Sequence, residues 1–282
     1  MKKIIGLAGT LVLAVTALAG CSLDSSSSAA SSNCTPQHEG LSTVSKGVLT
    51  VSAAVFPPFT KVEGTKLSGV EGQILDKVAS LECLTVTAQP LDTGSVVSAA
   101  QNGRVDIAAG NWYCTAARAK VMALAGPVYG DQIGILSTNN ASTFGELQGK
   151  TVGTVDGYNW NAEFKELYGQ GLKIYPNATA MYNDFKAGRL DVAVDSFGSA
   201  VYANEQNGGK WTVKVPAADP RVAASVNPAQ ACFPVAKQNE ALANAVIEDI
   251  RKIRADGTLA AILKGNGLDP SAANVSKLQL IG

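Results

Sequence analysis

The 282-residue chain contains a single histidine, His38, and this scarcity limits the chemistry open to it. A Ser/His/Asp or Cys/His catalytic arrangement needs an imidazole beside the nucleophile, and His38 lies close to a serine-rich stretch. Transition-metal sites depend on histidine or clustered thiols, and no glycine-rich loop of the P-loop type occurs. We therefore expect no metal, no cofactor and no enzymatic activity of these classes.

Charged residues are also scarce. Asp, Glu, Lys and Arg make up 16% of the residues, with 23 basic against 23 acidic side chains. A nucleic-acid-binding protein needs a basic face that neutralises phosphates, and this composition does not favour one. Apolar runs of membrane-spanning length are absent after the N-terminal segment.

The N-terminus has the pattern of an export signal. Lys2 and Lys3 precede an apolar run over residues 4–15 that is too short to span a bilayer stably, and Leu-Ala-Gly-Cys follows at 18–21. That ending resembles the bacterial lipobox, in which the cysteine receives a diacylglycerol and becomes the new N-terminus. We expect residues 1–20 to be a signal peptide and Cys21 to be a lipid anchor on the extracytoplasmic side of the cell membrane. The alternative is an ordinary cleaved signal with a chance cysteine.

Residues 25–32 are serine and alanine only and have no apolar bulk to offset the entropy of ordering them. We expect residues 21–45 to form a tether from lipidated Cys21. The remainder is long enough for a core divided between two lobes.

Four further cysteines could form disulfide bonds after export: Cys34, Cys83, Cys114 and Cys232. Their spacing matches no zinc motif, and the even number favours two bridges among three possible connectivities. We favour Cys34 with Cys83 and Cys114 with Cys232, with buried free thiols as the alternative.

Strand-like and helical runs alternate along the chain. Strands are predicted at 48–53, 84–87 and 105–108, with helices at 72–81 and 96–101 between them. The same rhythm recurs with strands at 151–155, 172–175 and 190–194 and helices at 160–167 and 180–187. This order predicts an α/β fold with parallel strands, whose ligand sites lie at the carboxyl ends of the strands.

Residues 101–108 (QNGRVDIA) and 186–193 (KAGRLDVA) echo each other. Each segment has a helix closed by Gly, an Arg, and a strand that opens with an apolar residue and Asp. A glycine helix cap alone would explain part of the match, but we favour two similar lobes.

An ordered set of short motifs runs from residue 46 to residue 268: FPPF at 56–59, GVEG at 69–72, GRVD at 103–106, TAARAK at 115–120, GPVY at 126–129, LQGKTVG at 147–153, GRLD at 188–191 and DGT at 256–258. In this order they resemble the polar amino-acid family, family 3, of bacterial extracellular solute-binding proteins. The resemblance implies a periplasmic-binding-protein-like (type II) fold, with a ligand cleft between two α/β lobes. Lobe 1 would comprise 46–135 plus 232–282 and lobe 2 would comprise 136–231, with strands crossing near 133–136 and 231–235.

The resemblance also implies a monomeric protein that captures an amino acid or similar small zwitterion and delivers it to the permease and ATPase subunits of an ABC importer. Arg118 occupies the family's carboxylate-binding position, and its guanidinium can donate two parallel hydrogen bonds. Asp195 corresponds to the acid that binds the ligand ammonium, and Phe56 to the aromatic that lies along the ligand side chain. The alternative for Arg118 is an exposed arginine at a helix start, for Asp195 a surface-loop carboxylate or helix cap, and for Phe56 packing in the core.

The chain departs from the family in the positions of its aromatic side chains. Thr93 stands where an aromatic is frequent, and aromatic or amide side chains replace small ones at Asn111, Trp112, Tyr113, Tyr158, Asn159 and Trp160. A cleft with these walls suits a ligand with an apolar, aromatic or weakly hydrated cationic portion, and packing inside the lobes is the alternative for each Trp.

Two other functions remain open. The same scaffold includes exported dehydratases of the cyclohexadienyl type, in which Glu71 or Asp195 would be the proton donor. A lipoprotein sensor without a transport role is the other alternative, although the presence of both Arg118 and Asp195 argues against a loss of ligand binding.

Overall fold

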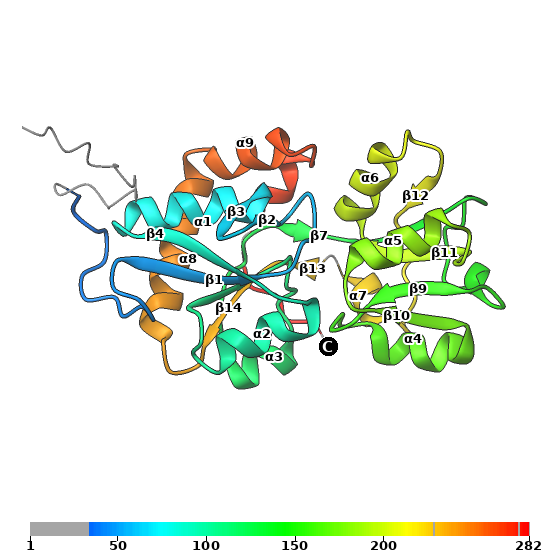
Figure 1. Ribbon diagram of the computed structural model, residues 1–282, viewed down its shortest axis with the longest axis horizontal. Coiled ribbons are helices and arrows are strands. Elements are labelled where there is room, and N and C mark those ends of the chain that lie inside the picture. The colour runs from blue at the N-terminus through cyan, green and yellow to red at the C-terminus, as the bar shows by residue number, and fades with distance from the viewer. Residues whose placement is uncertain (1–33, 228, 276, 282) are drawn as a thin grey trace, which may run out of the picture.

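The computed structural model describes residues 34–227, 229–275 and 277–281. The predicted signal peptide, Cys21 and the serine-rich part of the tether lie outside the described residues. Two α/β lobes lie side by side, each built on one five-stranded sheet (Figure 1). The predicted two-lobe α/β architecture is therefore confirmed.

Lobe 1 contains a sheet of order β4-β1-β5-β14-β6. Its strands are β1 (Val48–Ala53), β4 (Thr85–Pro90), β5 (Ile107–Ala109), β6 (Met122–Ala125) and β14 (Phe233–Ala236). β1 is parallel to β4 and β5, whereas β14 is antiparallel to β5 and β6. A small hairpin of β2 (Lys61–Glu63) and β3 (Lys66–Ser68) precedes the first helix.

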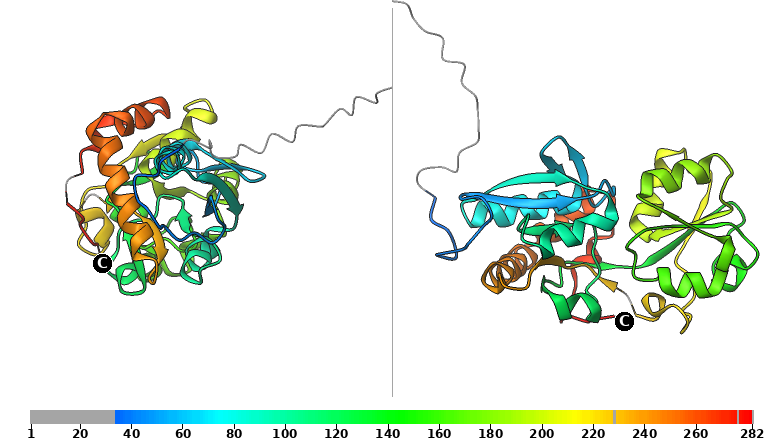
Figure 2. Two further views of the ribbon diagram at one scale, coloured as in Figure 1. Left: turned by 90° about the vertical axis from the view of Figure 1, so that its left-hand side faces the viewer. Right: turned by 60° about the horizontal axis from the view of Figure 1, so that its bottom comes forward.

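The helices of lobe 1 are α1 (Gly69–Leu81), α2 (Thr93–Gln101), α3 (Ala116–Val121), α8 (Glu240–Ala255) and α9 (Thr258–Gly265), followed by the short η3 (Pro270–Ala273). α1, α8 and α9 pack against one another, and α2 packs on β1, β5 and β14. Figure 2 shows helices on both sides of the sheet, which explains why the strands are apolar.

Lobe 2 contains a sheet of order β10-β9-β11-β8-β12. Its strands are β8 (Ile133–Ser137), β9 (Val152–Val155), β10 (Leu172–Tyr175), β11 (Val192–Ser196) and β12 (Thr212–Lys214). Its helices are α4 (Asn161–Tyr168), α5 (Ala178–Lys186), α6 (Phe197–Gln206) and α7 (Ala223–Val226), with short turns η1 (Gly145–Leu147) and η2 (Gly169–Gly171). Every residue of β8, β9 and β11 is buried, as expected for central strands covered on both faces.

The two lobes repeat one topology, as the echoed segments predicted. In lobe 1, β1 lies between its parallel neighbours β4 and β5, and in lobe 2, β9 lies between its parallel neighbours β10 and β11. The next strand in each sheet, β14 or β8, is antiparallel. The two echoed aspartates make equivalent hydrogen bonds, since Asp106 Oδ2 accepts the backbone N–H of Thr50 at 2.8 Å and Asp191 Oδ2 accepts that of Thr151 at 2.7 Å. Both carboxylates therefore fix the start of a neighbouring strand and have a structural role.

The lobes are joined by β7 (Gly130–Asp131) and β13 (Ala229–Gln230), which pair antiparallel. The sequence predicted the first crossing at 133–136, and this prediction is wrong, because the crossing strand β7 lies just before these residues. Residues 133–136 belong to β8, which pairs with β11 and β12 inside lobe 2. The cause is that the apolar run 133–136 looks like a buried crossing strand, whereas the actual crossing strands are short and partly polar, with the sequences Gly-Asp in β7 and Ala-Gln in β13. Lobe 2 accordingly begins near residue 132 rather than 136.

The folded region begins earlier than expected, because residues 34–45 pack on lobe 1 and are not part of a free tether. Cys34 forms a disulfide with Cys83, and the N–H groups of Gln37 and Val44 donate to Leu81 O at 3.0 Å and to Asp106 Oδ1 at 2.8 Å. The second disulfide joins Cys114 to Cys232. The favoured pairing of the four cysteines is therefore confirmed.

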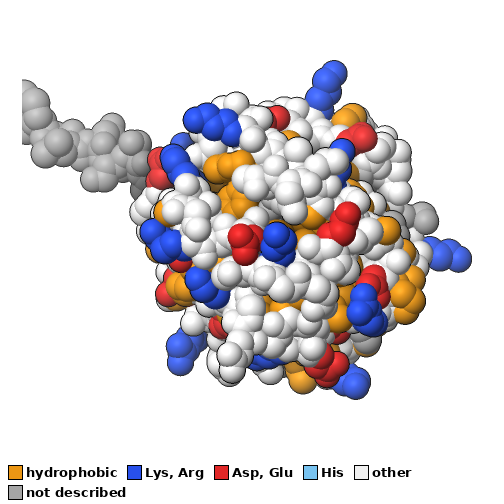
Figure 3. Space-filling view, turned by 90° about the vertical axis from the view of Figure 1, so that its right-hand side faces the viewer, with side chains coloured by type: hydrophobic (Ala, Val, Ile, Leu, Met, Phe, Trp, Pro, Cys, Tyr) orange, Lys and Arg blue, Asp and Glu red, His pale blue; other side chains and the backbone are white. Residues whose placement is uncertain are grey.

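Charged side chains are sparse on the surface as well. On the face of lobe 2 seen in Figure 3, Lys and Arg side chains are interspersed with Asp and Glu among uncharged neighbours. Among the described residues, no helix combines the length and hydropathy of a membrane span.

Candidate functional site

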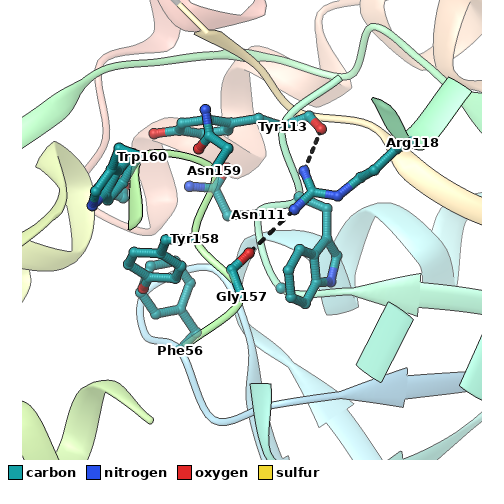
Figure 4. Close-up of a pocket in the computed structure, with 11 residues that line it drawn as sticks. Phe56, Asn111, Tyr113, Arg118, Gly157, Tyr158, Asn159 and Trp160 are labelled. Atoms are coloured by element: carbon teal, nitrogen blue, oxygen red, sulfur yellow. Dashed lines mark hydrogen bonds between the residues drawn. The ribbon is translucent and has the colours of Figure 1, made fainter. Parts of the chain in front are cut away.

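A narrow cavity lies between the lobes, and the space in it that can hold the centre of a water molecule is about 20 Å³. Both lobes line it: lobe 1 contributes Phe56, Gly110, Asn111, Trp112, Tyr113 and Arg118, and lobe 2 contributes Gly157, Tyr158, Asn159, Trp160 and Ser196 (Figure 4). Most of the expected ligand-binding residues are therefore brought together. Thr93 and Asp195 are not among the lining residues.

Arg118 is the charged group of this cavity. Thr115 caps α3 by accepting the backbone N–H of Arg118 at 3.1 Å, so the side chain leaves from the first turn of the helix. Its guanidinium donates to Tyr113 O at 2.6 Å and, across the cleft, to Gly157 O at 3.4 Å (Figure 4). It also lies 4.9 Å from the centre of the Trp112 ring.

The surroundings of Arg118 are poorly hydrated. Loss of water lowers the pKa of the guanidinium to about 10, although it still carries its charge at neutral pH. Among the described residues it forms no salt bridge; its protein partners are two carbonyl groups and one aromatic ring. A positive charge that has neutral partners in a desolvated cleft favours an anionic ligand.

Asn111 begins the loop that leads to Arg118, and its backbone has the left-handed φ of 56°. Glu71 holds this turn, because its carboxylate accepts the N–H of Gly110 at 2.6 Å and of Asn111 at 2.9 Å. The hydroxyl of Tyr129 donates to the same carboxylate at 2.7 Å. Burial raises the pKa of Glu71 to about 7. Glu71 is thus a positioning residue, and it does not line the cavity.

Asp131 in the hinge strand β7 fixes the same loop from the other side. Its Oδ2 accepts a hydrogen bond from the Asn111 amide and another from the Tyr113 hydroxyl, the latter at 3.1 Å. Burial raises the pKa of this carboxyl as well. Sequence reasoning missed Asp131; the only signal was an acid within the largely apolar stretch 128–136.

Asp195 differs most from its expected role. Its side chain is fully buried, and its two oxygens accept the hydroxyls of Tyr158 and Tyr182 at 2.7 Å each. Burial raises the pKa of Asp195 to about 7. In this conformation Ser196 lines the cavity and Asp195 does not, so a contact between the Asp195 carboxylate and a ligand ammonium stays a prediction.

Thr93 also has a structural position. It is the first residue of α2, is buried, and its carbonyl oxygen lies close to Gly157 across the cleft.

Aromatic rings form the walls of the cavity and continue into the lobe interiors. The Phe56 and Tyr158 rings meet edge to face across the cleft, with centroids 6.1 Å apart. Tyr158 packs on Trp160 at 4.8 Å, and Tyr113 of lobe 1 approaches Trp160 of lobe 2 at 6.0 Å. Trp112 and Trp160 are 4% and 2% exposed, so both line the cavity and pack in the interior at once.

Three polar atoms of the lining have no hydrogen-bond partner within the described chain: Asn111 Oδ1, Trp112 Nε1 and Ser196 Oγ. Buried polar groups are normally paired, because an unpaired one costs about 1 to 3 kcal/mol. One acceptor, one donor and one hydroxyl are therefore available to a bound molecule, in addition to Arg118.

The loop of the site is braced against the returning chain. Cys114 N donates to Gln230 O and Cys232 N donates to Trp112 O, both at 2.8 Å, and the Cys114–Cys232 disulfide crosses the same pair of segments. The lobes also contact each other directly, since Ser199 Oγ of lobe 2 donates to Pro57 O of lobe 1 at 2.7 Å. The conformation is closed around the cavity.

Several solved structures of the same fold are described as amino-acid-binding proteins. One is described as the substrate binding protein of an amino acid ABC transporter; it has 23% sequence identity and a TM-score of 0.69, covering 78% of this chain and 99% of that one. An ABC uptake transporter substrate binding protein from Streptococcus pneumoniae with bound histidine has 18% identity and a TM-score of 0.70, covering 81% and 95%. An ancestral arginine-binding protein bound to glutamine has 23% identity and a TM-score of 0.69, covering 79% and 98%.

Curated proteins gave no significant match to the sequence. A family model, in contrast, matches residues 49–267, which include both sheets and all the lining residues of the cavity. The chain belongs to the bacterial extracellular solute-binding proteins, family 3.

Proposed function

We propose that this protein captures a small carboxylate-bearing solute of amino-acid type outside the cytoplasm and delivers it to the permease of an ABC importer. The observation that carries the proposal is the position of Arg118, whose desolvated guanidinium faces the cavity between two closed lobes without an acidic partner among the described residues. The relatives with this fold are described as binding amino acids for ABC transporters, which supports the same role here.

The polar contacts of the ligand follow from the free groups of the lining. Arg118 donates to the ligand carboxylate, and an α-ammonium group donates to Asn111 Oδ1 and Ser196 Oγ. Asp195 then acts indirectly, by holding the hydroxyl of Tyr158 in the wall. A direct contact between Asp195 and the ammonium is the alternative assignment.

The apolar part of the ligand lies among Phe56, Trp112, Tyr158 and Trp160. The lining residues include no carboxylate that would pair with a basic side chain, and Arg118 is their single cation. An apolar or aromatic amino acid of moderate size fits this chemistry better than arginine, lysine or glutamate.

The protein binds its solute without converting it. Glu71 and Asp195 were the candidate acids of a dehydratase, and both carboxylates lie outside the cavity lining, with their oxygens bonded to backbone amides or tyrosine hydroxyls. A proton donor must reach the bound substrate, and neither carboxyl is placed to do so.

Attachment to the membrane through Cys21 belongs to the same proposal. The described chain begins at Cys34, which is held on lobe 1 by its disulfide to Cys83. A lipid on Cys21 would leave the cleft free to open, because the attachment point lies on lobe 1 and away from the cavity (Figure 1).

A thermal-shift screen of the twenty amino acids and common amines tests the proposal on the complete chain. A ligand bound only by the folded state at 100 times its Kd stabilises it by about 2.7 kcal/mol, which raises the melting temperature measurably. We expect one carboxylate-bearing class to stabilise the protein, to bind with a stoichiometry of one in calorimetry, and to be recovered unchanged. Absence of stabilisation by every carboxylate tested, or recovery of a converted product, would contradict it.

A further inference from the structure

A second cluster of polar side chains lies far along lobe 1 from the ligand cavity. It brings together His38 from the N-terminal segment, Glu82 from the end of α1, and Glu248 and Asp249 from α8. His38 is the only histidine of the chain, and its polar sequence surroundings predicted a position in or beside the tether. The fold instead seats it against two buried acids.

The imidazole is oriented by carboxylates on both of its nitrogens. Nδ1 lies 2.6 Å from Glu82 Oε1, and Nε2 lies 3.0 Å from Glu248 Oε2. Glu82 Oε2 accepts the backbone N–H of His38 at 3.0 Å, so Oε1 is the oxygen directed at the ring. A histidine that binds a metal through one nitrogen usually donates its other N–H to a carboxylate, as Nε2 does here.

Asp249 provides the independent observation. It is 2% exposed, and its Oδ2 accepts no hydrogen bond from an N–H or O–H group of the described residues, although the Glu82 carboxylate lies close enough to share a proton with it. One ligand atom each from His38, Glu82 and Asp249 lies within 4.8 Å of the others. When both are ionised, two buried carboxylates at this separation repel each other, and a cation bound between them removes that repulsion.

We propose that His38, Glu82 and Asp249 bind one divalent transition-metal ion of the Zn²⁺ type. A mixed imidazole and carboxylate set favours zinc and its neighbours over Ca²⁺ or Mg²⁺, which prefer oxygen ligands alone. Ligand atoms around tetrahedral zinc lie about 3.3 Å apart, so separations of up to 4.8 Å need to shorten by at most about 1.5 Å. The side chain of His38 is 27% exposed, which allows solvent to complete the coordination.

The metal would brace the N-terminal segment against α1 and α8. The Cys34–Cys83 disulfide already ties this segment to the residue that follows Glu82. A metal at His38 would add α8 to the same connection, at the point where the chain leaves toward Cys21. The site is independent of the ligand cavity, so its test does not depend on the proposed function.

The test uses Zn²⁺ alone as the probe, with the complete chain and no polyhistidine tag. Because the chain has one histidine, its imidazole gives a single pair of NMR signals, and calorimetry gives the stoichiometry. We expect one Zn²⁺ per chain, a shift or loss of the His38 signals on binding, and retention of Zn²⁺ in a large excess of Mg²⁺.

The variants His38→Gln and Asp249→Asn each remove one ligand, and we expect each to weaken Zn²⁺ binding at least tenfold. Glu240→Gln is the matched control: it removes one carboxylate from the exposed start of the same helix, and we expect affinity within a factor of two of the unchanged chain. If Asp249→Asn does not fold, the largely surface variant His38→Gln decides alone.

Three results would overturn the proposal: no stoichiometric Zn²⁺ binding, affinity within threefold of the unchanged chain in His38→Gln, or His38 signals that do not respond to bound Zn²⁺. Each would leave the cluster as an ion pair between one imidazolium and its neighbouring acids.

Discussion

Replacement of Arg118 by alanine tests the centre of the ligand site. In the closed structure the guanidinium has lost much of its water, so each hydrogen bond it donates to a ligand carboxylate is worth about 1.5 to 3 kcal/mol. Two such bonds from one fork give about 3 to 6 kcal/mol, which overlaps the range of about 2 to 5 kcal/mol or more seen when a buried charge loses its partner. We expect the Kd of the amino acid found in the screen to rise by roughly 10² to 10³ or more.

Matched variants separate this effect from a loss of structure. Arg118→Lys keeps the charge but cannot form the planar fork, so we expect an intermediate loss. Lys120→Ala removes an exposed cation from the same helix, and we expect no more than a twofold change. Isothermal calorimetry gives the affinities, and urea unfolding shows whether each variant is folded.

The reasoning is refuted if the Kd of Arg118→Ala for the ligand lies within threefold of that of the unchanged protein, as the Kd of Lys120→Ala does. That result would mean that the carboxylate is held elsewhere, with Trp112 Nε1 as the remaining unpaired donor of the lining.

Three further outcomes are expected. Replacing Cys114 and Cys232 together by serine should lower the free energy of unfolding by about 5 kcal/mol in denaturant titrations, because the bond closes a loop with a sequence separation of 118. Because the pKa of Asp195 is raised in the folded protein, its contribution to the free energy of unfolding is present at low pH and is lost between about pH 4 and about pH 7. The variant Asp195→Asn does not titrate and removes this loss. Its free energy of unfolding in urea, relative to that of the unchanged protein, should therefore rise by up to about 4 kcal/mol from pH 4 to pH 8. Cys21→Ser should abolish the incorporation of labelled fatty acid, and label retained in that variant would show that an anchor lies elsewhere.

Much of the fold follows from periodicity in the sequence. The strands at 48–53 and 172–175 have the predicted bounds, and the predicted helices end within a residue or two of α1, α4 and α5. Short apolar runs flanked by Gly indicate strands, and amphipathic runs of helical length indicate helices, so the type of most elements is clear from the sequence. The hinge was misplaced because residues 133–137 are apolar enough for either a crossing strand or a sheet strand.

The site was predicted less completely, because burial and partners decide which atoms remain free. Asp195 and Ser196 are adjacent at the end of β11, and the sequence does not show which of them faces the cavity. The hydroxyls of Tyr158 and Tyr182 decide it by binding the carboxylate. His38 was misassigned for a similar reason: the composition around it is polar, and only the contact with Glu82 shows that it belongs to the folded lobe.

The arrangement of supporting residues indicates the order in which a ligand is bound. Glu71 and Asp131 hold the Asn111 loop from lobe 1 and from the hinge, so this half of the site does not depend on closure. Lobe 2 adds the Gly157 carbonyl, which reaches Arg118 only when the lobes are together. We therefore expect the carboxylate to meet Arg118 first on an open lobe 1, and lobe 2 to close over the side chain by a hinge motion at β7 and β13.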